Sequence, residues 1–384
     1  MKFLSLTTDP TGGGSSKSLL YLLQGLKDKG WEIRMVLPKK DWLSDQLEKI
    51  NIKYDINPYL YLSIWPPTQS LFDYILYLPR LIKYRWFSFK AKRNLTLSVH
   101  RFSPDLIHSN VSVVDTGYKV AKKLNIPHIF HIREYGIEDF NFHFYPSENR
   151  KREFLKDSYS ICITEDLKRH FDLDSRNKVI YNGIRIKRQT FPTHKEHQDY
   201  FLFVGMLTKK KGIFDLLYSY KKYIDNGGKY KLIIAGPYLP KDYLELSSMI
   251  KEFHLTNKID ILGSRTDIDS LMQNAAAIIV PSYKEAFGRV LAEGMFNQCV
   301  IIGRNTGGLK EQFDIGLRSE QKEIGFRFNN TRELTEIMLT TENLTEEERF
   351  QLTEAALQVA NKFFSIESNI ELTDEFFKNI TNDR

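Results

Sequence analysis

The chain of 384 residues has only two cysteines, Cys162 and Cys299, and each lies in an apolar segment. Two isolated cysteines exclude a disulfide framework and a metal site built from cysteine pairs, so we expect two buried thiols in a reducing compartment. No apolar run approaches the roughly 20 residues that a membrane-spanning helix needs. The first residues, MKFLSLTTDPTGGG, are too weakly apolar for a secretory signal peptide, so we expect a cytoplasmic protein.

The glycine-rich stretch TGGGSSKS, residues 11–18, suggests a phosphate-binding loop but lacks the residue that such a loop requires. A P-loop has glycine directly before lysine, and here Ser16 precedes Lys17. The G-x-G-x-x-G pattern fails as well, because Lys17 takes the place of its last glycine. A turn between a first strand and a first helix remains. Its backbone either approaches a ligand closely or forms a plain flexible turn.

Metal-binding patterns are also missing. The nine histidines show no H-E-x-x-H or similar spacing. His108 and His131 follow apolar runs and are by default satisfied strand-end histidines, with His131 the closer to charged neighbours. Two D-x-D matches, at 172–174 and 267–269, carry little weight as metal motifs. We expect both to lie at helix starts, with Asp267 as an N-cap, and we expect no metal site.

Short apolar runs alternate with amphipathic helical patterns in both halves of the chain, which predicts parallel sheets covered on both faces. The predicted strands are 2–6, 32–37, 105–109, 128–132, 159–164, 199–205, 230–236, 258–263, 276–282 and 299–303. The predicted helices include 15–29, 211–225, 266–275 and 286–296, and residues 332–380 read as helices only. We therefore expect two doubly wound α/β domains, residues 1–183 and 184–365, and a final helix at 366–384 that crosses back to the first domain.

Positive charge gathers in the first half. Residues 1–183 hold 28 Lys/Arg against 20 Asp/Glu, whereas the remaining residues hold 27 against 28. Residues 72–93 carry seven aromatics and six Lys/Arg against one Asp. This composition suits a helix at a membrane interface, and it equally suits a helix that packs one aromatic face into its own domain. Pro79 would break or kink such a helix. Nucleic-acid binding is only weakly supported, because positive charge is the sole evidence for it.

The segment VPSYKEAFGRVLAEGMFNQCVIIGRNTGG, residues 280–308, contains two carboxylates, Glu285 and Glu293, with seven residues between them. Glu285 precedes a predicted helix, and Glu293 lies two turns further along the same face. Backbone N–H groups of Phe287 and Gly288 at a helix N-terminus suit sugar hydroxyls or a phosphate. The spacing alone fits two ordinary helix glutamates equally well.

The same segment resembles the E-x7-E signature of the retaining glycosyltransferases of family 4, which have the GT-B fold of two Rossmann-like domains facing each other across a cleft. The resemblance implies transfer of a sugar from a nucleoside diphosphate sugar to an acceptor hydroxyl with retention, with no cofactor and no strictly required metal. It covers about residues 2–365. Further matching segments follow in the order of the family, at 105–110, 126–136, 178–184, 203–212, 233–237, 261–268 and 305–311.

By resemblance, Glu285 would hold the transferred sugar, Glu293 the ribose diol and Lys211 the diphosphate. The implied donor-binding residues are Gly205, Met206, Lys211, Gly263, Arg265, Glu285, Phe287, Gly288, Arg289, Val290 and Glu293. The implied acceptor-binding residues are Gly13, Gly14, Ser15 and Lys17. The implied catalytic residues are Glu285, Lys211, Arg133, Glu134 and His131, with Arg133 and Glu134 projecting into the cleft.

Met206 departs from the family pattern, which usually has an arginine here. A thioether cannot neutralise a diphosphate, so a nearby cation compensates or the donor site is weakened. The candidate cations are Lys209, Lys210, Lys211 and Arg289. Two alternatives stay open, a nucleotide-sugar epimerase and a catalytically weakened sugar-nucleotide-binding protein.

For the acceptor we expect a lipid-linked glycan in bacterial surface polysaccharide biosynthesis. The basic and aromatic residues 72–93 would then contact anionic lipid at the inner face of the cytoplasmic membrane. We expect no nucleic-acid partner.

Overall fold

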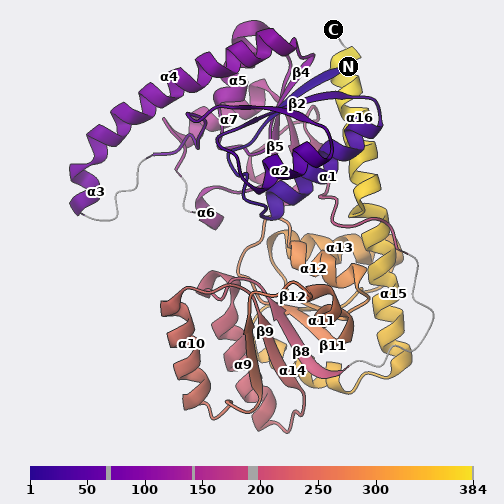
Figure 1. Ribbon diagram of the computed structural model, residues 1–384. Coiled ribbons are helices and arrows are strands. Elements are labelled where there is room, and N and C mark those ends of the chain that lie inside the picture. Colours follow the sequence, from indigo (N-terminus) through magenta and orange to yellow (C-terminus); the bar gives the residue numbers. More distant parts are fainter. Residues whose placement is uncertain (66–70, 141–142, 189–197, 383–384) are drawn as a thin grey trace. The chain divides into compact units, whose positions relative to one another are not determined.

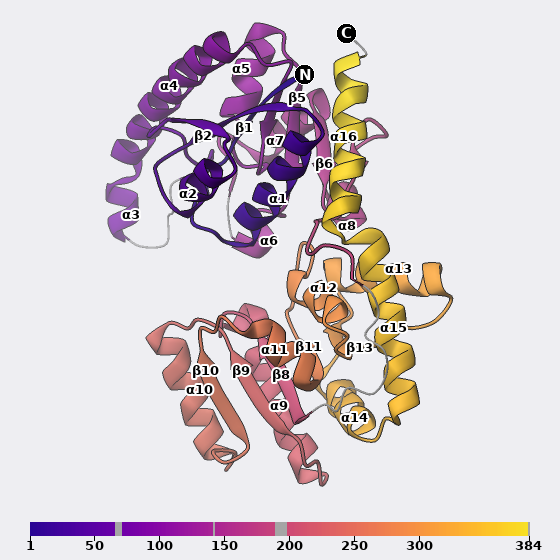
Figure 2. The same ribbon diagram turned by 45° about the vertical axis from the view of Figure 1, so that its right-hand side comes forward.

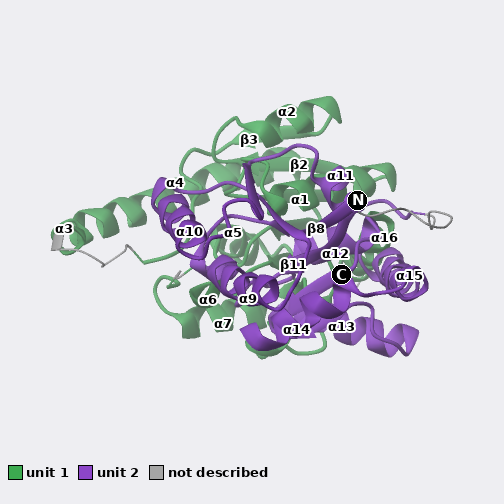
Figure 3. Ribbon diagram, turned by 90° about the horizontal axis from the view of Figure 1, so that it is seen from below, with its two compact units in different colours: residues 1–183, 366–384 green, residues 184–365 purple. Residues whose placement is uncertain are grey.

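The computed structural model describes residues 1–65, 71–140, 143–188 and 198–382, and its chain divides into two compact units (Figure 3). Unit 1 comprises Met1–Gly183 and Ile366–Arg384, and unit 2 comprises Ile184–Ser365. Both units are three-layered, with helices on both faces of a parallel sheet (Figures 1 and 2). This is the doubly wound α/β class that the alternating pattern predicts.

The sheet of unit 1 has the strand order β3-β2-β1-β4-β5-β6-β7, so the winding direction reverses between β1 and β4. Ligands of such sheets bind at this switch point, beyond the carboxyl ends of the strands. The five predicted strands are present, whereas β3 and β7 were not expected because they are short and polar. The strands are β1 Lys2–Leu6, β2 Glu32–Leu37, β3 Lys53–Ile56, β4 Leu106–Ser109, β5 His128–Ile132, β6 Tyr159–Cys162 and β7 Lys178–Val179.

The helices of unit 1 correct one expectation, the place of Asp172, and confirm another, the break near Pro79. Asp172 lies in the turn after α8, with φ +52°, and does not start a helix. The aromatic and basic segment is not one helix but two, because the chain breaks at Leu76, and Pro79 then lies in the first turn of α4, where its missing N–H costs nothing. The helices are α1 Gly14–Asp28, α2 Trp42–Lys49, α3 Leu71–Ile75, α4 Tyr77–Phe102, α5 Thr116–Leu124, α6 Ile137–Phe140, α7 Glu148–Asp157, α8 Glu165–His170 and α16 Ile366–Asn382.

The sheet of unit 2 has the order β10-β9-β8-β11-β12-β13, with its switch point between β8 and β11. The five predicted strands are present, and the three-residue β13 was too short to predict. The strands are β8 Gln198–Val204, β9 Lys231–Ala235, β10 Ile259–Gly263, β11 Ala275–Val280, β12 Ile301–Arg304 and β13 Phe326–Phe328. The helices are η1 Lys209–Lys211, α9 Ile213–Asp225, α10 Pro240–Glu252, α11 Ile268–Asn274, α12 Arg289–Phe296, α13 Gly307–Glu320, α14 Thr331–Glu342 and α15 Glu346–Phe363.

Apolar side chains fill the space between sheet and helices in each unit. In unit 2, Phe201 and Ile279 of the sheet share one core with Leu216 and Met338 of α9 and α14. Cys162 and Cys299 are buried thiols that form no disulfide, as the sequence predicts. Asp267 occupies the N-cap position of α11, but its carboxylate binds Arg265 and caps no N–H. Among the described residues, no helix is long and apolar enough to cross a membrane.

The last helix, α16, completes the core of unit 1. Phe377 is fully buried, and its ring centroid lies 5.3 Å from that of Phe3 and 5.8 Å from that of Trp31. Trp31 Nε1 donates to Asp374 Oδ1 at 2.7 Å. The final residues of the chain therefore stabilise the strand with which it begins.

We predict that Phe377→Ala lowers the free energy of unfolding of unit 1 by about 3–5 kcal/mol, because it removes a buried ring and leaves a cavity. All four tryptophans of the sequence lie in unit 1, so tryptophan fluorescence during urea unfolding reports on this unit. Leu372→Ala, on an exposed face of the same helix, is the matched control. Equal stabilities of the two variants would contradict this role of α16.

The stability of unit 1 should also depend on pH through three buried histidines, His108, His128 and His131. Burial lowers the pKa of His108 to about 3 and that of the other two well below the usual value. The unfolded chain takes up protons below about pH 6.5 while the folded unit does not. The contribution of these histidines to the free energy of unfolding is therefore fully present above pH 6.5. Below that pH it falls by up to about 1.4 kcal/mol per pH unit for each histidine.

The measurement is urea unfolding followed by tryptophan fluorescence from pH 7 to 4.5. The slope of the free energy of unfolding against pH gives the number of protons taken up on unfolding. His128→Gln should lower this number by about one, because it removes one of the three groups. A free energy of unfolding that stays constant from pH 7 to 5 would rule out neutral burial of these rings.

Candidate active site

The loops that follow β8 and β11 touch each other at the switch point of unit 2. A Cβ atom on Gly212 would lie 2.0 Å from the carbonyl oxygen of Pro281, and Gly212 has φ +72°. Only glycine allows this approach and this conformation together. The N–H of Tyr283 donates to the carbonyl of Lys210 at 3.1 Å. The two loops are therefore fixed against each other where open α/β sheets bind ligands.

An ion pair spans these loops. Lys211 Nζ lies 2.5 Å from Glu285 Oε1, and the two side chains are 39% and 19% exposed. The carbonyl of Glu285 accepts a hydrogen bond from the N–H of Gly308 at 2.8 Å. The structure thus brings together an ammonium group that can bind phosphate and a carboxylate that can bind hydroxyl groups, and solvent reaches both.

The backbone after Glu285 is held from α13. Gln312 Nε2 donates to the carbonyls of Phe287 and Gly288. Gly288 precedes α12 with φ +88°, and a Cβ atom there would lie 2.3 Å from Leu309. Arg289 and Val290 are the first two residues of α12, and the N-terminus of a helix can bind an anion or a hydroxyl.

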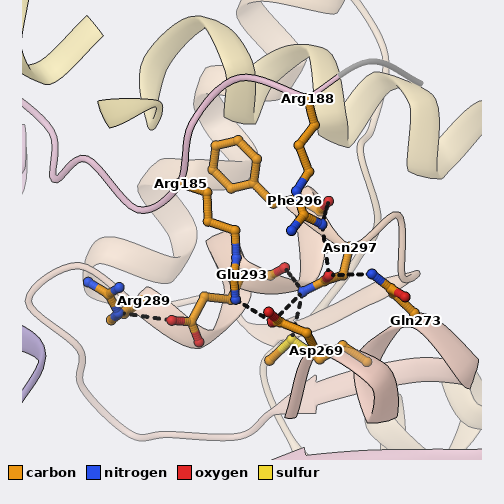
Figure 4. Close-up of polar contacts among 9 residues, drawn as sticks. Arg185, Arg188, Asp269, Gln273, Arg289, Glu293, Phe296 and Asn297 are labelled. Carbon is orange, nitrogen blue, oxygen red and sulfur yellow. Dashed lines mark hydrogen bonds and ion pairs between the residues drawn. The ribbon is translucent and has the colours of Figure 1, made fainter. Parts of the chain in front are cut away.

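Glu293, the second carboxylate of the E-x7-E segment, lies one turn along α12 (Figure 4). Arg289 Nε donates to Glu293 Oε1 at 2.9 Å, and both side chains are largely buried. Lys211 and Arg289 therefore each neutralise one of the two glutamates. Both cations are also candidates to bind the diphosphate that Met206 cannot bind.

The other implied donor residues follow the carboxyl edge of β8 and β10. Met206 is 47% exposed directly after Gly205. The N–H of Gly236 donates to the carbonyl of Gly263 at 2.8 Å, which joins the ends of β9 and β10. Arg265 is exposed and paired with Asp267. These residues lie on the same edge of the sheet as Lys211, so the structure gathers the implied donor-binding set along one edge.

Sequence reasoning missed Arg304, which braces the same edge. Arg304 ends β12 and is buried; its Nε donates to the carbonyl of Pro281 at 3.0 Å, and it forms an ion pair with Asp215. Its guanidinium group lies 4.5 Å from the ring centroid of Tyr283. Arg304 thus supports the loop that carries Glu285. An arginine at the end of the apolar run CVIIGR was the available signal.

In unit 1 the switch point brings Ser15 and Arg133 together through Asn110. Asn110 Nδ2 donates to Ser15 Oγ at 3.1 Å, and Arg133 Nε donates to Asn110 Oδ1 at 3.0 Å. Arg133 also donates to Asn182 Oδ1. Helix α1 begins beside this group at Gly14, after Gly13 as N-cap, and Gly13, Gly14 and Lys17 are exposed. A ligand at this edge would meet a helix N-terminus and an oriented guanidinium group.

His131 and Glu134 do not lie where the resemblance suggests. His131 is fully buried beneath Arg133, with Nδ1 3.3 Å from His108 Nε2 and 3.4 Å from Arg133 Nη2. Glu134 was expected to project from the domain, but its carboxylate is buried and accepts hydrogen bonds from the N–H and Oγ of Ser112, both at 2.7 Å. Burial raises the pKa of Glu134. Both residues are buried and support the loops around Arg133.

Comparison with known proteins gives two adjoining family matches. Residues 12–188 match the model of Glycosyltransferase Family 4, and residues 185–356 match that of Glycosyl transferases group 1. An uncharacterised glycosyltransferase of Methanocaldococcus jannaschii is 28% identical over 304 residues, which cover 74% of this chain and 79% of the relative. The O-antigen chain mannosyltransferase RfbU of Salmonella typhimurium is 27% identical over 241 residues, 62% of each chain.

The crystal structure of Anabaena HepE in complex with UDP superposes with a TM-score of 0.75 at 19% identity, covering 99% of this chain and all of that one. The shared fold is GT-B, with two Rossmann-like units. The two family matches together span residues 12–356, and the relatives are glycosyltransferases. The chain therefore belongs to the group 1 glycosyltransferases and is a transferase that depends on a nucleotide sugar.

Proposed function

We propose that the protein transfers a sugar, with retention, from a nucleoside diphosphate sugar to a lipid-linked glycan in bacterial surface polysaccharide biosynthesis. The observation that carries the proposal is the Lys211–Glu285 pair at the switch point of unit 2. The similarity to an O-antigen mannosyltransferase supports the class of pathway. The nucleotide sugar is the co-substrate, and the proposal requires no metal ion.

In the proposed donor complex, Glu285 binds hydroxyls of the transferred sugar and Glu293 binds the ribose diol. Lys211 exchanges its contact with Glu285 for the diphosphate, where its charge stabilises the leaving group as the sugar departs. The base lies near Gly263 and Arg265. The leaving diphosphate takes the proton of the incoming hydroxyl on the same face of the sugar, which accounts for retention without a protein nucleophile.

The proposed acceptor site lies on unit 1, at Gly13, Gly14, Ser15, Lys17 and Arg133. The N-terminus of α1 and the guanidinium group of Arg133 both favour a negatively charged carrier, such as the phosphate of a lipid-linked glycan. The hydrogen bonds to two asparagines, Asn110 and Asn182, and the neutral histidine beneath Arg133 keep this guanidinium group oriented.

We predict that Glu285→Gln lowers kcat/KM for transfer by about 10²–10³-fold, because it removes the carboxylate that binds the sugar and the partner of Lys211. The assay follows release of UDP, GDP or ADP from the corresponding sugars with a lipid-linked acceptor. Glu252→Gln, at an exposed glutamate of α10, is the control. Unchanged transfer by Glu285→Gln would refute the site. Release of nucleoside diphosphate without acceptor product would favour a hydrolase, and conversion of the donor sugar without such release would favour an epimerase.

Met206 offers a gain-of-function test. Met206→Arg should lower the KM for the donor several-fold, because a guanidinium group at this exposed position can bind the diphosphate bidentately. If the wild-type protein is only a weakened sugar-nucleotide-binding protein, it releases no nucleoside diphosphate and the variant gains turnover. A donor KM that stays equal or rises would show that the diphosphate lies away from this loop.

The surface of α3 and α4 supports contact with a membrane. Six exposed side chains within residues 72–89 are aliphatic, phenylalanine or tryptophan, and along α4 they recur at three- or four-residue spacing, which places them on one face. They are Phe72, Ile75, Leu78, Ile82, Trp86 and Phe89. Tyr84 on the opposite face is buried against Tyr61 and Tyr145. One face of residues 72–93 thus packs into unit 1, and the other face is exposed and available for the membrane contact that we propose.

Charge identifies the partner that we propose for this face. Residues 72–93 hold six Lys/Arg and one Asp, and the first turns of α4 and all of α3 lie away from the sheet of unit 1 (Figures 1 and 2). An exposed apolar stripe flanked by cations fits the anionic inner face of the cytoplasmic membrane. The protein would lie on this surface, where a lipid-linked acceptor is found.

We predict that the protein floats with vesicles that contain anionic phosphatidylglycerol and binds weakly to neutral phosphatidylcholine vesicles. Ile82→Ser with Trp86→Ser should abolish flotation, because it interrupts the apolar stripe. Leu97→Ser, an equally exposed position in the last turns of α4, should leave flotation unchanged. Absence of wild-type flotation with anionic vesicles would contradict the membrane contact.

A further inference from the structure

Asn297 lies one turn after Glu293 and is buried, with 2% of its surface exposed. Its Nδ2 donates to the carbonyl of Glu293 at 2.9 Å and to Asp269 Oδ1 at 3.1 Å. Its Oδ1 accepts from Arg188 Nη1 at 3.1 Å and from Gln273 Nε2 at 3.2 Å (Figure 4). An asparagine amide has two N–H donors and two lone pairs, so every hydrogen-bonding position of Asn297 is in use.

These bonds join three segments that are distant in the sequence, namely residues 184–188, α11 and α12. Residues 184–188 follow directly on the boundary between the units. Asn361 of α15 binds both the N–H and the carbonyl of Arg188, at 2.9 and 2.7 Å. Arg185 forms an ion pair with Asp269, the last residue of the second D-x-D match. Helix α12 is thereby fixed to two other segments at the turn that follows Glu293.

We propose that Asn297 is a positioning residue for donor binding. Its bonds to the carbonyl of Glu293 and to Asp269 fix the position of α12 along its axis and its rotation about that axis. They thereby also place the Glu293 carboxylate and the N–H groups of the first turn of α12. The inference rests on the proposed function, because it takes Glu293 as the ligand of the ribose diol. In a well-aligned site, displacing such a group by about 1 Å lowers the reaction rate on the order of 100-fold.

The test uses Asn297→Asp, which keeps the shape of the side chain and replaces its N–H donor with an acceptor. The new carboxylate faces Asp269 and the Glu293 carbonyl, so the Kd for UDP, measured by calorimetry on the full chain, should rise about tenfold at pH 8. At pH 5.5 the two carboxylates can share a proton, which restores a donor and should recover part of the affinity. The other charged groups at this site are Arg185, Arg188, Arg289 and Glu293.

A double variant distinguishes positioning from general loss of structure. Asn297→Asp combined with Asp269→Asn restores the bond between these two side chains with donor and acceptor exchanged, but not the bond to the Glu293 carbonyl, so part of the affinity should return. Gln273→Leu tests the same coupling more mildly at a half-buried position and should weaken UDP binding about threefold. Asn369→Asp, at a buried asparagine of unit 1 that donates to the carbonyl of Tyr181, should leave the Kd unchanged.

The outcomes separate this inference from the function on which it rests. If the wild-type protein binds UDP, GDP or ADP and both Asn297→Asp and Gln273→Leu bind it with the same Kd, the positioning role is overturned and the proposed function stands. The same holds for a loss that shows no pH dependence and no recovery in the double variant. A wild-type protein that binds none of the three nucleotides would overturn the proposed function and the inference with it.

Discussion

The proposed donor site depends on one close contact, the approach of the loop after β8 to the loop after β11. Gly212 permits it, because any side chain there would collide with the carbonyl of Pro281. This approach brings Lys211 within reach of Glu285, and Arg304 supports it from below through Pro281 and Asp215. The contact places an accessible cation and an accessible carboxylate where the winding of the sheet reverses, so the fold itself determines where the donor chemistry lies.

Unit 1 uses a different device at its own switch point. There a single guanidinium group, that of Arg133, is oriented by asparagine side chains on separate loops. Burial keeps the pKa of His108 and His131 low, so the rings beneath Arg133 stay neutral at physiological pH and add no charge. The edge thus presents one directed cation beside a helix N-terminus, which suits recognition of one anionic group.

Much of the fold could be predicted from the sequence, because long apolar runs and helical periodicity are local signals. The missed strands β3, β7 and β13 are short or polar, and pairing with a neighbour defines them. The site was harder, since its contacts join segments far apart in the chain. Lys211 and Glu285 are 74 residues apart, and periodicity says nothing about such a pair. Glu134 was expected to project from the domain but is buried, because no local signal reveals that Ser112 binds its carboxylate.

The central claim is that the loops after β8 and β11 bind the nucleoside diphosphate part of the donor. Hydrogen–deuterium exchange of the full chain, with and without UDP, tests it most directly, because amides that bind or surround the ligand exchange more slowly. The account predicts protection within residues 205–212 and 285–293, and none within α13 beyond Gly308. Protection confined to unit 1, or none in these two loops despite measurable UDP binding, would contradict it.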